Sequence, residues 1–174
     1  MKRLFGLIIT ALLASSASAW AYSPGSGFVG GELGYGIVTS GGGADLNYGP
    51  VFGYAPSPTV LVSGFFNYLP RGTIADGNGN TASGSLKLLG GDIAFSPPNW
   101  LGASFGGRAA YGINNTNFNG ASQTEKGVYF GPQLTYQIQL AIATTLDAEV
   151  YYLFTTANSS NSIVGFQGCV RFWF

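Results

Sequence analysis

Two carboxylates two residues apart, Asp147 and Glu149, are the residues of this sequence best placed to do chemistry. Residues two apart on a β-strand point to the same face, so these side chains would be neighbours. Neighbouring carboxylates can act as general acid and general base. The chain contains no histidine, which excludes histidine-dependent triads, dyads and metal sites. Both carboxylates would face the narrow interior of a β-barrel, which side chains fill. We therefore interpret them as part of an internal charge network and expect no enzymatic activity.

Two further features that could support chemistry give weaker signals. The single cysteine, Cys169, has no histidine to activate it, so we interpret it as a small, inert interior residue. The stretch Asp76–Asn80 looks like the start of a calcium loop, but the sixth position is Thr81 instead of glycine and the twelfth is Lys87 instead of glutamate. We predict no catalytic residue, no cofactor and no metal ion.

The last thirteen residues, Ser162–Phe174, show which kind of element must position these side chains. Alternate residues, including Phe174, Phe172 and Val170, form an apolar face, whereas the opposite face carries Arg171. A period of two is typical of a β-strand whose faces meet different surroundings. The apolar face is too continuous to lie in water, which indicates the closing strand of a membrane barrel.

The same alternation recurs in seven earlier segments, separated by polar or by glycine- and proline-rich breaks. Every even-numbered connection is short and most odd-numbered ones are longer and polar, as in bacterial outer-membrane barrels. We predict an all-β fold, an eight-stranded antiparallel up-and-down transmembrane β-barrel formed by residues 20–174, with external loops at 70–84 and 114–125. The predicted strands are about 28–39, 44–55, 59–69, 85–95, 100–113, 126–138, 143–155 and 162–174.

The charges are expected to line the interior of this barrel. Only 8% of the residues are charged, against about 25% in an ordinary soluble domain. A Lys or Arg that faces lipid at mid-depth would cost about 2–4 kcal/mol. A bulge at Gly90–Gly91 is predicted to turn Leu86 and Leu88 outward and Lys87 inward. The predicted lumen charge network consists of Glu32, Asp45, Asp92, Arg108, Asp147, Glu149 and Arg171.

Arg171 is expected to join the last strand to its neighbours. Antiparallel pairing places it near Asp147 or Glu149, and barrel closure brings Glu32 close as well. A buried charge is tolerated when it is paired and hydrogen-bonded. The inward acids outnumber the inward arginines, so a water-filled lumen would favour cations. A plugged lumen and a narrow, cation-preferring channel are both compatible with this pattern.

The N-terminus has the signature of an exported protein. Lys2 and Arg3 precede an apolar segment, residues 4–14, and Ala17–Ala19 forms a small-residue cleavage site. We predict that residues 1–19 are a cleaved signal peptide. Cleavage leaves five basic residues against seven acidic ones, which is not the basic balance of a nucleic-acid-binding protein.

The segment Leu89–Asn115 resembles the middle hairpin of the OmpX/OmpA-type small outer-membrane proteins. Its short turn ends in Trp100, and its glycine- and alanine-rich second strand ends in Tyr111–Gly112. Residues 127–154 and the C-terminal strand look similar to the last three strands of that family. The resemblance implies a bacterial outer-membrane location, contact with outer-membrane lipid and lipopolysaccharide, and a monomeric barrel.

The C-terminus carries a second part of the resemblance. Phe174, with Phe172 and Val170 alternating before it, resembles the signal that the barrel-assembly machinery recognises. The leading functional hypothesis is a non-enzymatic outer-membrane barrel with a structural or surface-interaction role through its external loops. A small channel is the second hypothesis. The third, a secreted soluble carrier of lipocalin shape, conflicts with the outward apolar face. The sequence does not identify an external partner.

Overall fold

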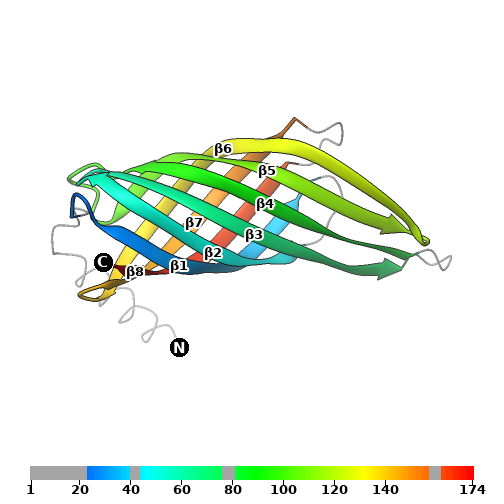
Figure 1. The fold of residues 1–174 in the computed structure, drawn as a ribbon, viewed down its shortest axis with the longest axis horizontal. Coiled ribbons are helices and arrows are strands. Elements are labelled where there is room, and N and C mark those ends of the chain that lie inside the picture. Colours follow the sequence, from blue (N-terminus) through cyan, green and yellow to red (C-terminus); the bar gives the residue numbers. More distant parts are fainter. Residues whose placement is uncertain (1–22, 40–43, 76–80, 157–161) are drawn as a thin grey trace, which may run out of the picture.

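The computed structural model of the chain describes residues 23–39, 44–75, 81–156 and 162–174. They form eight strands that close into one antiparallel barrel in the order β1 to β8 (Figure 1), which confirms the predicted fold class. Among these residues no helix has the length and hydropathy needed to cross a membrane. The predicted signal peptide lies outside the described residues. The strands are β1 (Gly27–Val38), β2 (Ala44–Ser57), β3 (Val60–Ala75), β4 (Thr81–Phe95), β5 (Ala103–Phe118), β6 (Ala121–Ala141), β7 (Thr144–Thr155) and β8 (Ile163–Trp173).

Closure depends on the pairing of the first strand with the last. β1 pairs with β2 on one side and with β8 on the other, in an unbroken register from Phe28 opposite Trp173 to Val38 opposite Ile163. Backbone groups without a partner cost several kcal/mol each in lipid, so a sheet in a membrane has to close. Phe174 takes part, because its backbone exchanges two 3.0 Å hydrogen bonds with Gly27.

The two faces of the barrel are inverted relative to a soluble protein. The outward leucines Leu33, Leu89 and Leu134 have between 60% and 65% of their surface exposed, whereas the inward Arg108 and Arg171 have 2%. An exposed apolar belt of this extent marks a surface that contacts lipid or another apolar partner. The belt therefore argues against the soluble carrier.

The lumen is packed with side chains, and the part of it next to the long hairpins is apolar. On β4 and β7 the inward residues change from polar to apolar toward the end at which the long β3–β4 and β5–β6 hairpins project. The β3–β4 register pairs Leu69 with Leu86, and that of β7–β8 pairs Leu153 with Ile163. We call this set the apolar layer: Leu69, Leu86, Leu88, Tyr129, Leu153 and Ile163, all 3% exposed or less.

The loops predicted at 70–84 and 114–125 are mostly β-strand, so that prediction was wrong. β3 continues to Ala75 and β4 begins at Thr81, while β5 and β6 continue to a two-residue turn at Asn119–Gly120. The strands stay paired to their ends, with Ala75 opposite Thr81 and Phe118 opposite Ala121. These extensions form a four-stranded sheet beyond the other strands (Figure 1), which we call the projecting sheet: residues 70–75, 81–85, 114–118 and 121–126.

The bulge predicted at Gly90–Gly91 is also absent. The register of β4 runs through both glycines without a shift on the β3 side and on the β5 side. Strict alternation therefore turns Leu86 and Leu88 into the lumen and Lys87 outward, the reverse of the prediction. The physical reason is close packing of the strands, since a Cβ atom on Gly90 would lie 2.1 Å from the backbone oxygen of Ala109.

Adjacent glycines on β5 test how closely the inward backbone is packed. A Cβ atom on the inward Gly106 would lie 1.9 Å from the carbonyl oxygen of Ile93, whereas one on the outward Gly107 would meet no atom closer than 3.8 Å. We expect Gly106→Ala to lower the unfolding free energy by about 1–3 kcal/mol, as overpacking does. Gly107→Ala is the matched control and should be nearly neutral. Urea titration of both variants refolded into vesicles provides the measurement, and equal losses would contradict the packing argument.

Candidate functional site

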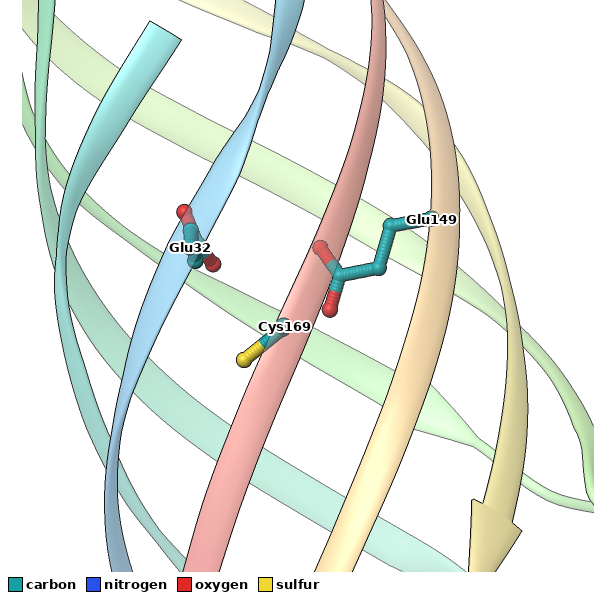
Figure 2. A group of neighbouring side chains, drawn as sticks. All are labelled: Glu32, Glu149 and Cys169. Atoms are coloured by element: carbon teal, nitrogen blue, oxygen red, sulfur yellow. The ribbon is translucent and has the colours of Figure 1, made fainter.

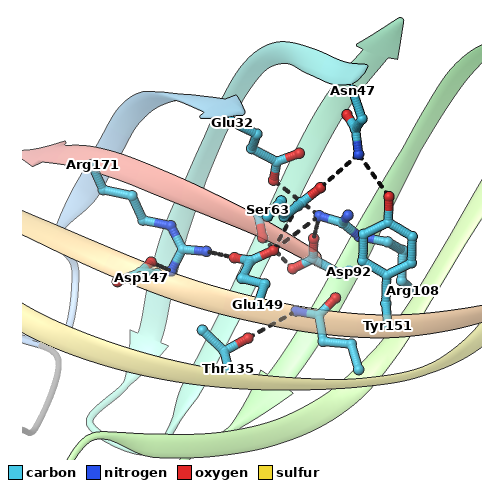
Figure 3. A network of polar contacts seen from close by, with 12 residues as sticks. Glu32, Asn47, Ser63, Asp92, Arg108, Thr135, Asp147, Glu149, Tyr151 and Arg171 are labelled. Carbon is cyan, nitrogen blue, oxygen red and sulfur yellow. Dashed lines mark hydrogen bonds and ion pairs between the residues drawn. The ribbon is translucent and has the colours of Figure 1, made fainter. Parts of the chain in front are cut away.

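A buried ion network occupies the middle of the lumen (Figure 3). Arg108, on β5, lies at its centre. One guanidinium nitrogen of Arg108, Nη2, lies 2.9 Å from Glu32 on β1, 3.3 Å from Asp92 on β4 and 3.4 Å from Glu149 on β7. A single cation thus connects four strands across the barrel.

Register and aromatic packing position Arg108. It lies directly opposite Asp92 in the β4–β5 ladder, so one of its partners is a cross-strand neighbour. Its guanidinium carbon also lies 4.1 Å from the ring centre of Phe65 and 4.8 Å from that of Tyr151. Aromatic faces attract cations within about 6 Å, most strongly where water is excluded. The two rings therefore stabilise the charge and restrict where the side chain can move.

Arg171, on β8, forms the second half of the network. Its two terminal nitrogens lie 2.6 Å from Asp147 and 2.6 Å from Glu149, both on β7. The ring of Phe28 lies 4.8 Å from its guanidinium carbon. Because Glu149 contacts Arg108 with one oxygen and Arg171 with the other, it joins the two halves.

Neutral polar side chains make further hydrogen bonds to some of the charges and to one another. Gln167 donates to Glu149 at 2.8 Å, and the Ser63 hydroxyl donates to Asp92. Asn47 donates to the Tyr151 hydroxyl at 2.7 Å and to the Gln167 carbonyl at 3.0 Å. Buried polar groups are tolerated only when they are connected in this way.

The structure brings six of the seven predicted lumen charges into this network. Asp45 lies apart, 3.8 Å from Arg71 near the projecting sheet. Glu32 pairs with Arg108, across the barrel from the neighbouring strand on which Arg171 was expected to meet it. The aromatic contacts and the Asn47 bridge were not anticipated. The alternation of the sequence indicates which side chains face inward, but it does not indicate which of them meet across the lumen.

Cys169 raises the question of a metal site. Glu32, Glu149 and Cys169 each offer one ligand atom within 4.8 Å of the others (Figure 2), and carboxylate and thiolate groups are donors that Zn²⁺ accepts. The two oxygens of Glu149, however, already accept hydrogen bonds from Arg171 and Gln167 at 2.6 and 2.8 Å. A metal ion would have to displace these donors. We therefore interpret the group as part of the ion network.

The projecting sheet offers a second candidate site, the edge of β6. The pairing of β6 with β7 ends near Val128, whose backbone bonds to Thr156. Residues two apart on a strand direct their backbone groups to the same side. The N–H and C=O groups of Ser122, Thr124 and Lys126 therefore point away from β5, toward a side where no described strand pairs with them. Such an edge can accept a further strand.

Comparisons with known proteins identify the fold. No family model matches the chain, and no curated protein matches it in sequence. The solved structures similar to it include Neisserial surface protein A, with a TM-score of 0.66 at 12% identity over 86% of this chain and 97% of that one. The Ail protein of Yersinia pestis gives 0.61 at 14% identity over 87% and 100%. The N-terminal barrel domain of Pseudomonas aeruginosa OprF gives 0.53 at 14% identity over 88% and 100%.

At these identities the likeness concerns the fold alone. It confirms the resemblance to small eight-stranded outer-membrane barrels at that level. The roles of the residues in the lumen and on the projecting sheet therefore have to be tested by substitutions in this chain.

Removing the central cation of the network should be strongly destabilising. Arg108→Met leaves three buried carboxylates without it, so we expect the unfolding free energy to fall by about 3–5 kcal/mol. Adding Glu32→Gln removes one of those charges and should restore part of the loss. The control is Arg71→Met, because the Arg71–Asp45 pair is long and partly exposed and should contribute less than about 1 kcal/mol. Equal losses for the two arginine variants in urea titrations would contradict a stabilising role for the network.

Proposed function

We propose that this chain is a non-enzymatic outer-membrane barrel that displays the projecting sheet outside the membrane as a docking surface for an extended partner segment. The single observation that carries the proposal is the open edge of β6. Ser122, Thr124 and Lys126 present their backbone groups along it, and all three residues are exposed. A peptide that adds to a sheet edge gains affinity from backbone hydrogen bonds and specificity from alternate side chains.

The composition of the projecting sheet indicates what kind of partner would suit it. Its four segments contain mostly Ser, Thr, Asn, Gly and Ala, with charge only at Arg71, Glu125 and Lys126. Recognition there would depend on hydrogen bonds more than on long-range charge attraction. One structural neighbour is named an attachment invasion locus protein and another structure holds it with a sulfated heparin analogue. The name supports a surface role, but the scarcity of basic residues does not favour a heavily sulfated ligand for this chain.

The absence of enzymatic activity is part of the proposal. The chain has no histidine, and the carboxylates of the lumen are each bound to a guanidinium group. The apolar layer lies between that network and the projecting sheet. A substrate entering from outside would have to displace packed leucines before it reached a carboxylate.

The same layer argues against the channel hypothesis. Leu69, Leu88 and Leu153 are completely buried, so the outer part of the lumen is filled by side chains. We expect no discrete conductance steps from purified protein in planar bilayers. Replacing Leu88 and Leu153 together by alanine should create a cavity but leave the ion network in place beneath it. Cation-selective openings of the unmodified protein would show that the lumen conducts and would contradict this prediction.

A proline at the edge of β6 tests the docking surface. Thr124→Pro removes an N–H that points to the open side, so the β5–β6 ladder keeps its hydrogen bonds. We expect cells that display this variant to bind an immobilised panel of extended peptides about tenfold more weakly than wild type, which corresponds to about 1.4 kcal/mol. Thr124→Ala is the matched control, because it removes the same side chain and keeps the N–H. Equal binding by the two variants, at equal surface amounts, would show that the edge does not dock the partner.

A further inference from the structure

A row of three inward residues on β1, β2 and β3 has a glycine at its centre. Glu32 on β1 is directly opposite Gly49 on β2. The register of β2 with β3 pairs Tyr48 with Tyr68, which places Asn67 opposite the same glycine on its other side. Neighbouring strands are about 4.8 Å apart, so the backbones of Glu32 and Asn67 are about 10 Å from each other. Their side chains therefore share the space on the lumen side of Gly49.

That space is lined with buried oxygen atoms. A Cβ atom added at Gly49 would lie 3.1 Å from Oδ1 of Asn67 and 1.6 Å from the backbone oxygen of Phe66. The Asn67 side chain also approaches the Glu32 carboxylate. Asn67 is completely buried and Glu32 is 3% exposed, so their oxygens lie away from bulk water.

The oxygens around Gly49 lack hydrogen-bond donors. Glu32 accepts from Arg108 with Oε1, but neither its Oε2 nor Oδ1 of Asn67 has a donor among the described residues. Phe66 is level with Pro50, whose missing N–H leaves a strand ladder one hydrogen bond short. The β1–β2 ladder is continuous through Pro50, so the missing bond is one to β3. Buried acceptors almost always have a partner, and a species other than the protein is expected to complete this cluster.

Asn47, in the next inward row of β2, adds a further oxygen. A chain of hydrogen bonds fixes its orientation (Figure 3), since Gln167 donates to Glu149 and accepts from the nitrogen of Asn47. Oδ1 of Asn47 is thereby left without a donor in the part of the chain that the structure describes. Rows about 7 Å apart along a strand can be connected by a water molecule. Asn47 is therefore placed to hold a water beside the cluster.

The buried charges of the lumen do not balance. Four carboxylates face two guanidinium groups in the network of the described residues, which leaves an excess of two negative charges. Net charge enclosed away from water is costly, so a bound cation would stabilise the lumen. The carboxylates are those of Glu32, Asp92, Asp147 and Glu149, all 4% exposed or less, and the cations are Arg108 and Arg171.

We propose that the lumen side of Gly49 binds one Ca²⁺ ion, with Glu32, Asn67 and the backbone oxygen of Phe66 as its protein ligands. Ca²⁺ accepts carboxylate, amide and backbone oxygens in a flexible geometry, with water completing its shell. Its two charges equal the excess in the lumen. Mg²⁺ suits the site less well, because it requires a near-octahedral shell and gives up water reluctantly. The inference does not depend on the docking edge of β6.

This site differs from the metal sites considered above. The sequence prediction of no metal ion followed from the lack of histidine and of a complete calcium loop, whereas these ligands come from separate strands that the barrel brings together. The site uses Oε2 of Glu32, which is free, and leaves Oε1 bound to Arg108. It displaces neither Arg171 nor Gln167 from Glu149.

The test uses the full mature chain refolded into phosphatidylcholine vesicles, whose headgroups carry no net charge, in CaCl₂, MgCl₂ or EGTA. We expect CaCl₂ to raise the unfolding free energy in urea, and Ca²⁺ at about 100 times its dissociation constant corresponds to about 2.7 kcal/mol. MgCl₂ at the same concentration should have little effect. Chain refolded in CaCl₂ and separated from free ions should retain a single Ca²⁺ ion, measured by elemental mass spectrometry.

Substitutions at the ligands locate the ion. Asn67→Leu removes one ligand at nearly constant volume and should weaken Ca²⁺ binding by about tenfold or more. Asn114→Leu is the matched control, because it also removes a buried amide with an unpartnered oxygen, but on β5 opposite Leu86. It should keep the Ca²⁺ response of wild type. Glu32→Gln keeps an oxygen for Arg108 and removes the charge, and it serves as a second variant if Asn67→Leu does not insert.

Three outcomes would overturn the proposal. Equal unfolding free energies in CaCl₂ and EGTA, with no retained metal, would show that water alone satisfies the oxygens. Equal effects of CaCl₂ and MgCl₂ would indicate a general salt effect. An equal loss of the Ca²⁺ response in Asn67→Leu and Asn114→Leu would show that the ion does not lie at Gly49. Heat-modifiable migration separates these results from failed insertion, since a chain that does not insert fails before any metal is varied.

Discussion

The requirement that every strand face lipid on one side determines most of this structure. Side chains alternate along a strand, so each residue that faces lipid has neighbours that face the lumen. Charges cannot be placed on the lipid side at mid-depth, and they collect in a space that is narrow and closed. Arg108 and Arg171 meet that constraint by connecting carboxylates from β1, β4 and β7. The ion network is therefore a consequence of the fold as much as a support for it.

A network of this kind contributes specificity more clearly than stability. Removing ions from water costs several kcal/mol each, and their mutual attraction repays this only when the geometry is good. What the network favours is a pairing pattern, because Glu149 contacts both arginines in the observed registers of β7 with β8 and, through β6, of β7 with β5. A shift of one strand by one residue would turn every inward charge of that strand toward lipid. The cost of such a shift protects the register.

The alternation of the sequence predicted the strand number, the closed barrel and the inward placement of the charges, because these depend on local period alone. The partners within the lumen could not be predicted in the same way. Glu32 lies on a strand next to Arg171 yet binds Arg108 from the far side of the barrel, and strand tilt decides such contacts. Composition was misleading for the projecting sheet. Its polar residues suggested loops, although Asn119–Gly120 is a strong hairpin signal, and the signal was present in the sequence.

The outward position of Lys87 shows how one wrong local prediction, the bulge at Gly90–Gly91, can assign a surface residue to the interior. With a bulge at Gly90–Gly91, Lys87 would point into the lumen and the outer face would carry no pair of cations. The continuous register instead places it in one row with Ile113 and Lys126, next to the polar residues of the projecting sheet. The barrel thus has two distinct polar regions, one sealed inside by the apolar layer and one at the membrane surface. Of these two regions of the described residues, the second is exposed, so interactions of this chain with its surroundings are expected to involve β4, β5 and β6.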